Sequence, residues 1–512
     1  MARFRALPEA SRALLVRLVT RRGTMFRRSR LNYPEIGDTA AAAAPLVQLG
    51  WVDEAAELDV EQLQGLLTKA ELLDNFPILR PHRARKKPEL VAVLRAHSPG
   101  SQPFQAWFRL TTDRVYHLTV APLCERFRLM FFGNFHQDWS EFVLADLGVL
   151  AYEKVPAALQ SPAFGTRAHV DAFERLYQCR QQLDAGTALA VVAERMPPPI
   201  EDCDWLEDRR QKLLYQIARG HEKSGDPSSA LAVLAECSHR GARIRRIRLQ
   251  ERAHAWEMAR SLCLEALQKP ENEAERQQLQ RVLPRLNRKL GIATTTSFEP
   301  CRVPSFELLV TAPTEDCAVE LRARDRLARD AAGSAVHYVE NGLVNALFGL
   351  LCWKAIFAPI AGAFFHDFQY GPADLSSSRF YRRRCRDFAE CFAELESDRY
   401  QATIRHYFAE KAGIQCPFVD WGLLNKSLLD RALACFPPAH LKLWFEWMLS
   451  DMQENRAGFP DLVQFWPQER RYRMIEVKGP GDRLQDNQRR LLEYCLTHRM
   501  PVAVCKVRWA DS

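Results

Sequence analysis

The chain has 512 residues, of which 47% are hydrophobic, and carries a formal net charge of +8 with a pI of about 8.8. This length allows roughly three domains, and the hydrophobic fraction is sufficient for several buried cores. The basic excess is mild, so any affinity for phosphate groups has to come from local clusters of Lys and Arg rather than from the total charge.

The 14 cysteines are scattered, and none forms a Cys-x-x-Cys pair or stands beside paired histidines. This spacing excludes a structural zinc site. Scattered free thiols are typical of a reducing, intracellular compartment. The N-terminal segment MARFRALPEASRALLVRLVTRRG has no uninterrupted apolar core, so we expect no secretory signal and a cytoplasmic location.

Residues 1–55 contain two helix-like runs joined by the arginine-rich segment RRGTMFRRSRLNYPEIGD, and they predict a small helical or winged-helix-like unit. Residues 56–165 begin with two helix-like runs around a basic connection that is punctuated by prolines. The order helix, basic turn, helix resembles a SAP module, which is a small DNA-binding helix pair. The alternative is that these charges are only solvated. The candidate DNA contacts are Arg83, Arg85, Lys86 and Lys87.

Residues 166–290 are predicted to be almost entirely helical. The segment LLYQIARGHEKSGDPSSALAVLAEC places Ala218, Gly220 and Ala230 where tetratricopeptide-like hairpins need small residues for close helix packing. The densely basic segment HRGARIRRIRLQER follows, and it offers Arg245 and Arg246 as candidate DNA contacts. A solvated helix face is the alternative for this segment.

Residues 291–512 begin with the loop ATTTSFEPCRVP, which leads into a helical region. Within that region, residues 341–365 are long and apolar enough to resemble a membrane span. Lys354 lies at the centre, at a cost of about 2.5–3.5 kcal/mol for insertion, and Pro359 would break the helix. The segment therefore predicts a buried core helix and no membrane association.

The last part of the chain has the predicted order strand, strand, helix, strand, over PDLVQFW, RYRMIEVKG, DRLQDNQRRLLEYCLTH and PVAVCKVRW. Pro460 places Asp461 at the start of the first strand. Side-chain alternation places Glu476 and Lys478 on one face of the second strand, where Asp461 can approach them if the strands pair. The alternative is a set of ordinary ion pairs on a hairpin.

This trio has the composition of a metal-dependent phosphodiesterase site. Paired carboxylates bind Mg²⁺ or Mn²⁺, the metal lowers the pKa of a bound water, and a nearby lysine orients that water. The carbonyl of Val477 would supply another oxygen ligand. Because the order of elements fits the core of PD-(D/E)xK nucleases, we predict a multidomain, mostly α-helical protein. Its C-terminal α/β domain, residues 291–512, would have this restriction-endonuclease-like fold.

The segment PDLV…EVKGPGDRLQDNQ resembles the VRR-NUC subset of that superfamily. Upstream, VHYVENGLVNALFGLLCWKAIF and GPADLSSSRFYRRR resemble the start of the nuclease domain in Fanconi-associated nucleases, and the resemblance extends over nearly the whole chain. It implies a structure-specific DNA nuclease of the phosphodiesterase I type, with endonuclease and 5′-exonuclease activity on 5′-flap or branched double-stranded DNA. It further implies interstrand crosslink repair, two Mg²⁺ or Mn²⁺ ions and a nucleoid-associated location.

The resemblance also assigns further residues. Glu340 in YVENGL matches the third acidic metal ligand, and Gln488 matches a supporting glutamine, although Leu491 stands where the family usually has an aromatic residue. Arg382 and Arg383, in RFYRRRCR, become candidate backbone contacts within the nuclease region. The chain lacks the ubiquitin-binding zinc finger of animal members, so recruitment through ubiquitin is not implied.

Two alternatives to a flap nuclease stay open at this point. Some VRR-NUC proteins resemble Holliday-junction resolvases, which cut four-way junctions. A non-catalytic DNA-binding repair scaffold would use the helical middle to hold its partners.

Overall fold

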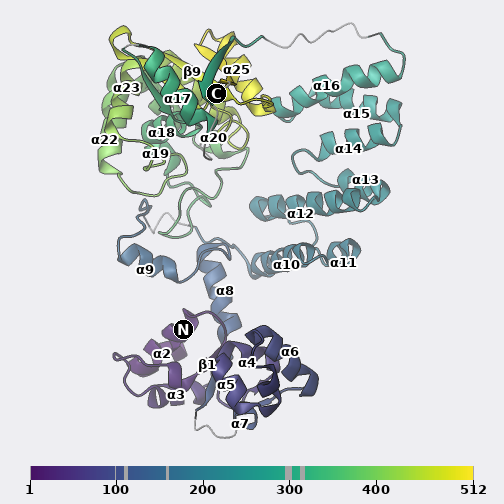
Figure 1. Ribbon diagram of the computed structural model, residues 1–512, viewed down its shortest axis with the longest axis vertical. Coiled ribbons are helices and arrows are strands. Elements are labelled where there is room, and N and C mark those ends of the chain that lie inside the picture. The colour runs from purple at the N-terminus through teal and green to yellow at the C-terminus, as the bar shows by residue number, and fades with distance from the viewer. Residues whose placement is uncertain are drawn as a thin grey trace. The chain divides into compact units, whose positions relative to one another are not determined.

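The computed structural model describes residues 2–98, 100–108, 113–156, 161–293, 302–311, 318–331 and 333–510. Most of the predicted loop ATTTSFEPCRVP therefore lies outside the described residues. The chain divides into two compact units, Met1–Leu144 and Ala145–Ser512, which are described separately below (Figure 1). In the described part of the chain, no helix is both long and apolar enough to span a membrane.

The first unit begins with two helices packed beside a small sheet. Helices α2 (Glu9–Val19) and α3 (Thr39–Gln48) contact each other and bury one apolar face of each helix. The antiparallel sheet has the order β1 (Met25–Arg27), β5 (Val115–Leu118), β2 (Val52–Asp53). The central strand comes from far along the sequence, so the next three α-helices lie in the chain between the outer strands and the central strand.

Those helices are α4 (Val60–Leu66), α5 (Lys69–Asn75) and α6 (Lys87–His97). Asp59 with Gln62 and Thr68 with Glu71 form capping boxes, which fix where α4 and α5 begin. The basic connection runs through the short 3₁₀ helix η2 (Pro77–His82) and ends where α6 starts. The predicted order of helix, basic connection, helix is confirmed, and part of the connection is the 3₁₀ helix η2.

The remaining elements of the first unit are short strands and helices. They are α1 (Ala2–Arg5), η1 (Arg28–Arg30), the strand pair β3 (Glu57–Leu58) and β4 (Gln102–Pro103), α7 (Phe104–Trp107) and α8 (Ala121–Phe132). Helix α9 (Ser140–Asp146) follows at the boundary with the second unit.

The second unit starts with a stack of helices, which confirms the helical prediction for this region. They are α10 (Arg167–Asp184), α11 (Leu189–Glu194), α12 (Asp204–Lys223), α13 (Pro227–Ala235), α14 (Ala242–Arg252), α15 (Trp256–Gln268) and α16 (Glu273–Lys289). Consecutive helices pack on each other (Figure 1). The small residues act as expected: Ala218 and Ala230 are buried between α12 and α13, and a Cβ on Gly220 would lie 2.8 Å from Leu189 Cδ2.

A five-stranded mixed sheet organises the C-terminal region. Its order is β6 (Ser305–Thr311), β10 (Val502–Ala510), β9 (Arg471–Lys478), β8 (Leu462–Trp466), β7 (Ala335–Tyr338). The first three strands are parallel and the last two pairs are antiparallel. The predicted order strand, strand, helix, strand is confirmed by β8, β9, α25 (Asp486–Thr497) and β10.

The prediction of a purely helical region ahead of that tail was incomplete. Strands β6 and β7 flank α17 (Val319–Asp330) and form the two edges of the sheet. Each is short or half-exposed and contains polar residues, so the alternation of apolar side chains is weak. Pairing with distant strands, and not local sequence, decides these two elements.

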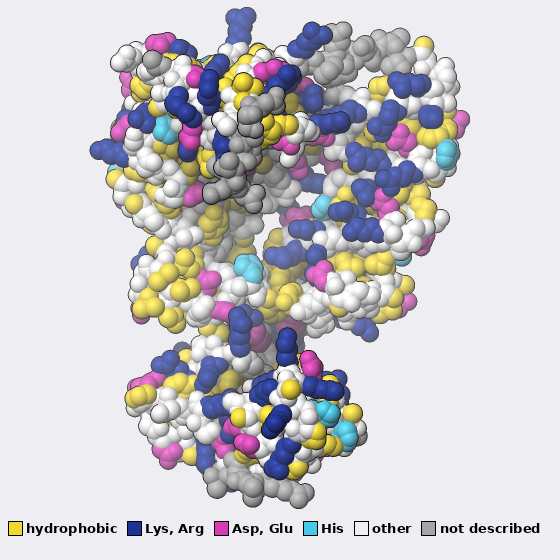
Figure 2. Space-filling view, viewed as in Figure 1, with side chains coloured by type: hydrophobic (Ala, Val, Ile, Leu, Met, Phe, Trp, Pro, Cys, Tyr) yellow, Lys and Arg dark blue, Asp and Glu magenta, His cyan; other side chains and the backbone are white. Residues whose placement is uncertain are grey.

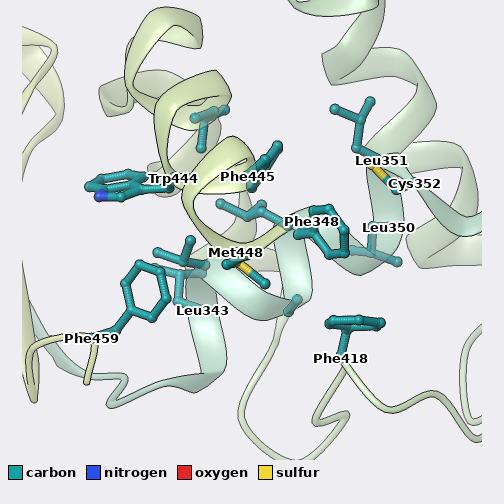
Figure 3. Close-up of a cluster of buried hydrophobic side chains, with 14 of the residues drawn as sticks. Leu343, Phe348, Leu350, Leu351, Cys352, Phe418, Trp444, Phe445, Met448 and Phe459 are labelled. Carbon is teal, nitrogen blue, oxygen red and sulfur yellow. The ribbon is translucent and has the colours of Figure 1, made fainter. Parts of the chain in front are cut away.

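The apolar core of the C-terminal region surrounds α18 (Gly342–Leu351), which is buried from Leu343 to Leu351. Figure 3 shows Leu343 and Phe348 of α18 facing Trp444, Phe445 and Met448 of α24 (Pro438–Ser450). The prediction of a core helix in residues 341–365 is confirmed. Lys354 belongs to the next short helix, α19 (Trp353–Ile356), and its side chain is exposed.

Four further helices complete this region. They are α20 (Phe380–Arg383), α21 (Cys385–Ala393), α22 (Arg399–Glu410) and α23 (Lys426–Cys435). Helix α22 packs against α18, and α23 packs against β8, so the core and the sheet are joined.

Gly349 in α18 tests this packing. An added Cβ would lie 2.7 Å from Phe418 Cβ and 3.1 Å from Val419 Cγ2, atoms close to the backbone that cannot move aside. Gly349→Ala should therefore lower the free energy of unfolding by about 1–3 kcal/mol. Gly65→Ala in α4 is the control, because a Cβ there meets nothing within 4 Å, and it should be neutral or stabilise by about 0.5–1 kcal/mol. Calorimetric unfolding measures both; equal midpoints for Gly349→Ala and the parent would contradict the close packing.

Candidate active site

Asp461 lies where two neighbouring strands meet. It follows Pro460 and immediately precedes β8, as the sequence predicted. Its main-chain carbonyl accepts hydrogen bonds from the N–H groups of Val339 (2.8 Å) and Glu340 (3.1 Å), just after β7. Its carboxylate Oδ2 accepts a hydrogen bond from the Val477 N–H on β9, at 2.8 Å. Hydrogen bonds of Asp461 thus connect the ends of β7, β8 and β9.

Glu476 and Lys478 lie on one face of β9, which confirms the alternation argument. Lys478 Nζ is 2.8 Å from Glu476 Oε1. The Glu476 side chain is completely buried, whereas 15% of the Lys478 side chain is exposed. Strand β9 has neighbours on both sides, β8 and β10, so the backbone that carries this pair is held from both directions.

Glu340 reaches the same place from the chain segment between β7 and α18. Tyr338 donates a hydrogen bond from its hydroxyl to Glu340 Oε2, and Asn341 Nδ2 donates to Oε1 at 3.4 Å. The charge of Glu340 acts on both Asp461 and Glu476 and raises the pKa of each. The three acidic residues therefore form one electrostatic group, although Glu340 is far from the other two in sequence.

Burial and mutual repulsion alter the acidity of this group. Burial raises the pKa of Asp461 to about 6, and the negative charge of Glu320 adds to the shift. Burial also raises the pKa of Glu476 to about 7, with the charge of Asp461 as the next cause, while Lys478 acts in the opposite direction. Neighbouring buried carboxylates are costly to ionise together, and a cation is what relieves that cost.

The donor set fits a divalent metal ion. Glu476 Oε1 is paired with Lys478 Nζ at 2.8 Å, and Oε2 is buried without a hydrogen-bond partner among the described residues. Hard cations such as Mg²⁺ or Mn²⁺ prefer carboxylate and carbonyl oxygens. Within the described ranges, no three His, Cys, Asp or Glu side chains already converge as a closed metal site. An open site of this kind suits ions that keep water and substrate phosphate among their ligands.

The supporting residues have local roles in the fold. Gln488 forms a capping box with Gln485 at the start of α25, where its Oε1 accepts from the Gln485 N–H at 2.8 Å. Leu491, which replaces the aromatic residue of the family pattern, is buried in the core. The Val477 N–H is used by Asp461, so the orientation of this peptide unit is fixed beside the carboxylates.

The basic residues predicted to contact DNA differ in whether their side chains are exposed or already bonded to other groups. Arg83, Arg85 and Lys86 are exposed in the first unit, whereas Lys87 donates to the Gln64 carbonyl. Arg245 pairs with Glu222 at 2.6 Å, Arg383 pairs with Asp374 at 2.7 Å, Arg382 is exposed and Arg246 is half-buried. Figure 2 shows Lys and Arg side chains gathered over helices α14–α16. In the second unit, Arg245 and Arg246 belong to α14, whereas Arg382 and Arg383 belong to α20.

Sequence reasoning missed two residues near the carboxylates. Glu320 lies in the first turn of α17, and its charge raises the pKa of Asp461. Tyr338 ends β7 and holds Glu340. Neither has a spacing signal relative to Asp461, because β7 and α17 join the sheet through long-range pairing.

Carboxylates that border a sheet of this topology, with a lysine two residues after the second, define a hydrolytic, metal-dependent nuclease. Comparison with known proteins agrees. A model of the VRR-NUC domain matches residues 395–509, one of the FAN1 HTH domain matches residues 1–53, and one of the Fanconi anemia-associated nuclease SAP domain matches residues 57–107.

Relatives of known identity resemble the chain over almost its full length. A Fanconi-associated nuclease 1 homolog of Pseudomonas aeruginosa is 49% identical over 99% of this chain and 91% of its own. One from Arabidopsis thaliana is 24% identical over 99% of this chain and 64% of its own. The crystal structure of paFAN1 bound to a 5′-flap DNA with a 2-nucleotide flap and a gap matches with a TM-score of 0.93, at 49% identity, over 100% of this chain and 93% of that one. The chain belongs to the Fanconi-associated nuclease family.

The buried Glu476 makes a prediction about stability. Its pKa in the folded state, about 7, is above the ordinary value of 4.5, so the folded protein loses stability as pH rises from about 4.5 to about 7 and the loss persists above that range. Glu476→Gln removes this titration. In EDTA, the stability of Glu476→Gln relative to the parent should increase by about 1–3 kcal/mol between about pH 5 and about pH 8.

Thermal unfolding across this pH range measures the difference. Glu469→Gln is the matched control, since Glu469 is an exposed glutamate on the same hairpin that pairs with Arg471. Its stability difference from the parent should not grow with pH. If the stability difference between Glu476→Gln and the parent stays constant or shrinks as pH rises, the raised pKa of the buried Glu476 carboxylate is contradicted.

Proposed function

We propose that this nuclease cleaves phosphodiester bonds next to 5′ flaps in branched double-stranded DNA, as part of interstrand crosslink repair. The observation that carries the proposal is the fully buried Glu476 carboxylate, which lies beside Asp461. Its Oε1 is paired with Lys478, and its Oε2 has no partner among the described residues. The choice of substrate is supported by paFAN1, which binds 5′-flap DNA with a 1-nucleotide or 2-nucleotide flap. A location at the nucleoid follows from such a substrate.

The residues that would hold the metal are Glu340, Asp461, Glu476 and the Val477 carbonyl. Two Mg²⁺ or Mn²⁺ ions are proposed, as the family resemblance implies, and both metals prefer such oxygen ligands. When bound, such ions supply a water of lowered pKa and neutralise charge on the phosphate.

The chain itself positions the reacting groups. The hydrogen bond from the Val477 N–H keeps the Asp461 carboxylate turned toward β9. The Lys478 ammonium, which is paired with Glu476 and partly exposed, orients the attacking water and stabilises the negative charge that develops on the phosphate. Exposed arginines and lysines, Arg83, Arg85, Lys86 and Arg382 among them, contact DNA phosphates, so affinity falls steeply with salt.

Three variants test the catalytic site on a labelled 5′-flap substrate with Mn²⁺ or Mg²⁺. Asp461→Ala and Lys478→Ala should each reduce the cleavage rate by about 100-fold or more, because each removes a group that acts in the transition state. DNA binding, measured by fluorescence anisotropy, should remain within a few-fold of the parent. Glu469→Gln, which alters an exposed carboxylate of the same hairpin, should cleave normally.

Substrate comparison separates the alternatives in the same experiment. The 5′ flap should be cut faster than a 3′ flap or a four-way junction. Fastest, symmetrical cutting of the four-way junction would favour a resolvase. Unchanged cleavage by Asp461→Ala, or equal cleavage in EDTA and in Mg²⁺, would contradict the proposed catalytic site.

A further inference from the structure

A cavity of about 820 Å³ lies in the nuclease region next to the catalytic carboxylates. It begins at Asn341, which directly follows Glu340 and donates to it at 3.4 Å. Asn341 also accepts a hydrogen bond from the Phe459 N–H at 3.0 Å, two residues before Asp461. The cavity and the metal-binding group therefore share a wall. Residues that line it include Asn341, Asn345, Tyr370, Phe418, Trp421 and Arg456.

Close packing fixes the far wall of this cavity. That wall is the loop of residues 416–422, which lies against α18 and against Gly371. A Cβ on Gly371 would lie 2.8 Å from Pro417 Cγ, and one on Gly349 would lie 2.7 Å from Phe418 Cβ. The Phe418 ring packs edge-on to Phe348 of α18, with 4.9 Å between centroids (Figure 3). The loop is thus held in place before any ligand arrives.

The lining combines flat aromatic surfaces with one cation. The Tyr370 side chain is 52% exposed. Trp421 is half-buried, and its Nε1–H donates to the Ile414 carbonyl at 2.8 Å, which fixes its ring. The Arg456 guanidinium lies 4.4 Å from the centroid of the Phe418 ring and donates to the Pro417 carbonyl. Aromatic rings and arginine planes are the surfaces on which unstacked bases are bound.

Two residues of the lining each carry a buried polar atom that has no partner among the described residues. Asn345 is buried, and its Oδ1 has no hydrogen-bond donor among the described residues, while its amide nitrogen donates to the Arg456 carbonyl at 2.9 Å. Arg456 Nε likewise has no acceptor in the described part of the chain. Buried polar atoms without a hydrogen-bond partner lower the stability of a folded protein, and they are frequent where a ligand completes the site.

We propose that this cavity receives one unpaired base of the DNA strand that the carboxylates cut. This proposal rests on the proposed function and specifies how the substrate strand is positioned. The cavity has the volume of a small-molecule site. Its lining combines aromatic rings with polar and charged side chains, Asp420 and Arg456 among them, and it adjoins Glu340 through Asn341. Bases near a flap are already unpaired, so placing one in the cavity costs little unstacking energy. Holding that base fixes the phosphate beside it relative to Glu340 and Asp461.

The test uses 5′-flap substrates that carry a single abasic residue at successive positions across the flap and the junction. Single-turnover cleavage with Mg²⁺ is measured for the parent, for Tyr370→Ala and for Tyr381→Ala. Tyr381 is the matched control, because it is also an exposed tyrosine but lies on α20, outside the cavity lining. Since Tyr370→Ala removes an exposed side chain, it should fold; Trp421→Phe, which keeps an aromatic ring, is a second variant.

The parent should lose about 10-fold in rate at one abasic position, which is the value of a single base stack. Tyr370→Ala should be about 10-fold slower on the intact flap and should no longer respond to the abasic residue at that position. Tyr381→Ala should behave like the parent, and Trp421→Phe should retain the positional response.

Three results would overturn the proposal. They are a parent rate that is independent of the abasic position, a positional effect that survives in Tyr370→Ala, and a similar loss in Tyr381→Ala. Free dAMP tests whether the cavity binds a released nucleotide instead of a base of the strand. Inhibition by dAMP that Tyr370→Ala relieves, together with no effect of any abasic position, would assign the cavity to a released nucleotide. Failure of the parent to cut any flap would instead reject the proposed function, and that result is seen before any abasic substrate is compared.

Discussion

The buried charge of Glu476 is the constraint on which the active site depends. A fully enclosed carboxylate is unfavourable unless cations compensate it. Lys478 pairs with Oε1 only, and Oε2 has no partner among the described residues. Asp461, placed beside it, adds repulsion and does not relieve it. In the proposed mechanism, a divalent cation relieves this local cost.

The surrounding structure explains how such a cost is tolerated. Strand β9 has strands on both sides, and the carbonyl of Asp461 fixes the chain at residues 339 and 340, so the carboxylates cannot move apart. Behind them, α18 and α24 form a large apolar core that supplies stability. The helical stack is attached to the same region, because Arg281 of α16 pairs with Asp486 at the start of α25, at 2.7 Å. Helices that carry basic side chains are therefore connected directly to the helix that follows the catalytic strand.

Sequence alone was sufficient for much of the site, for physical reasons that differ from residue to residue. The two-residue period of a strand is a local rule, so it correctly placed Glu476 and Lys478 on one face. Pro460 marked the start of β8 in the same way, and the apolar run around α18 could be recognised as a core helix. Glu340 came only from resemblance to a family, since a glutamate ahead of an apolar helix is common and its approach to Asp461 depends on pairing between β7 and β8.

The residues that sequence reasoning did not find share one property: long-range contacts bring them to the site. Glu320 belongs to a helix whose flanking strands, β6 and β7, have weak local signals. Tyr338 acts through a single hydrogen bond to Glu340. The basic residues show another limit of local reasoning, because Arg245 and Arg383, which charge density singled out as candidate DNA contacts, are held in ion pairs. Local density cannot show which charges the fold has already neutralised.

We propose that Glu476 and Asp461 form a destabilised group, which a divalent cation completes. The most direct measurement is the change in unfolding temperature on adding Mn²⁺ without DNA, for the parent, Glu476→Gln and Glu469→Gln. Mn²⁺ should raise the unfolding temperature of the parent and of Glu469→Gln toward the value that Glu476→Gln has in EDTA. The unfolding temperature of Glu476→Gln should remain nearly unchanged. An equal rise in all three proteins, or none in the parent, would contradict this proposal.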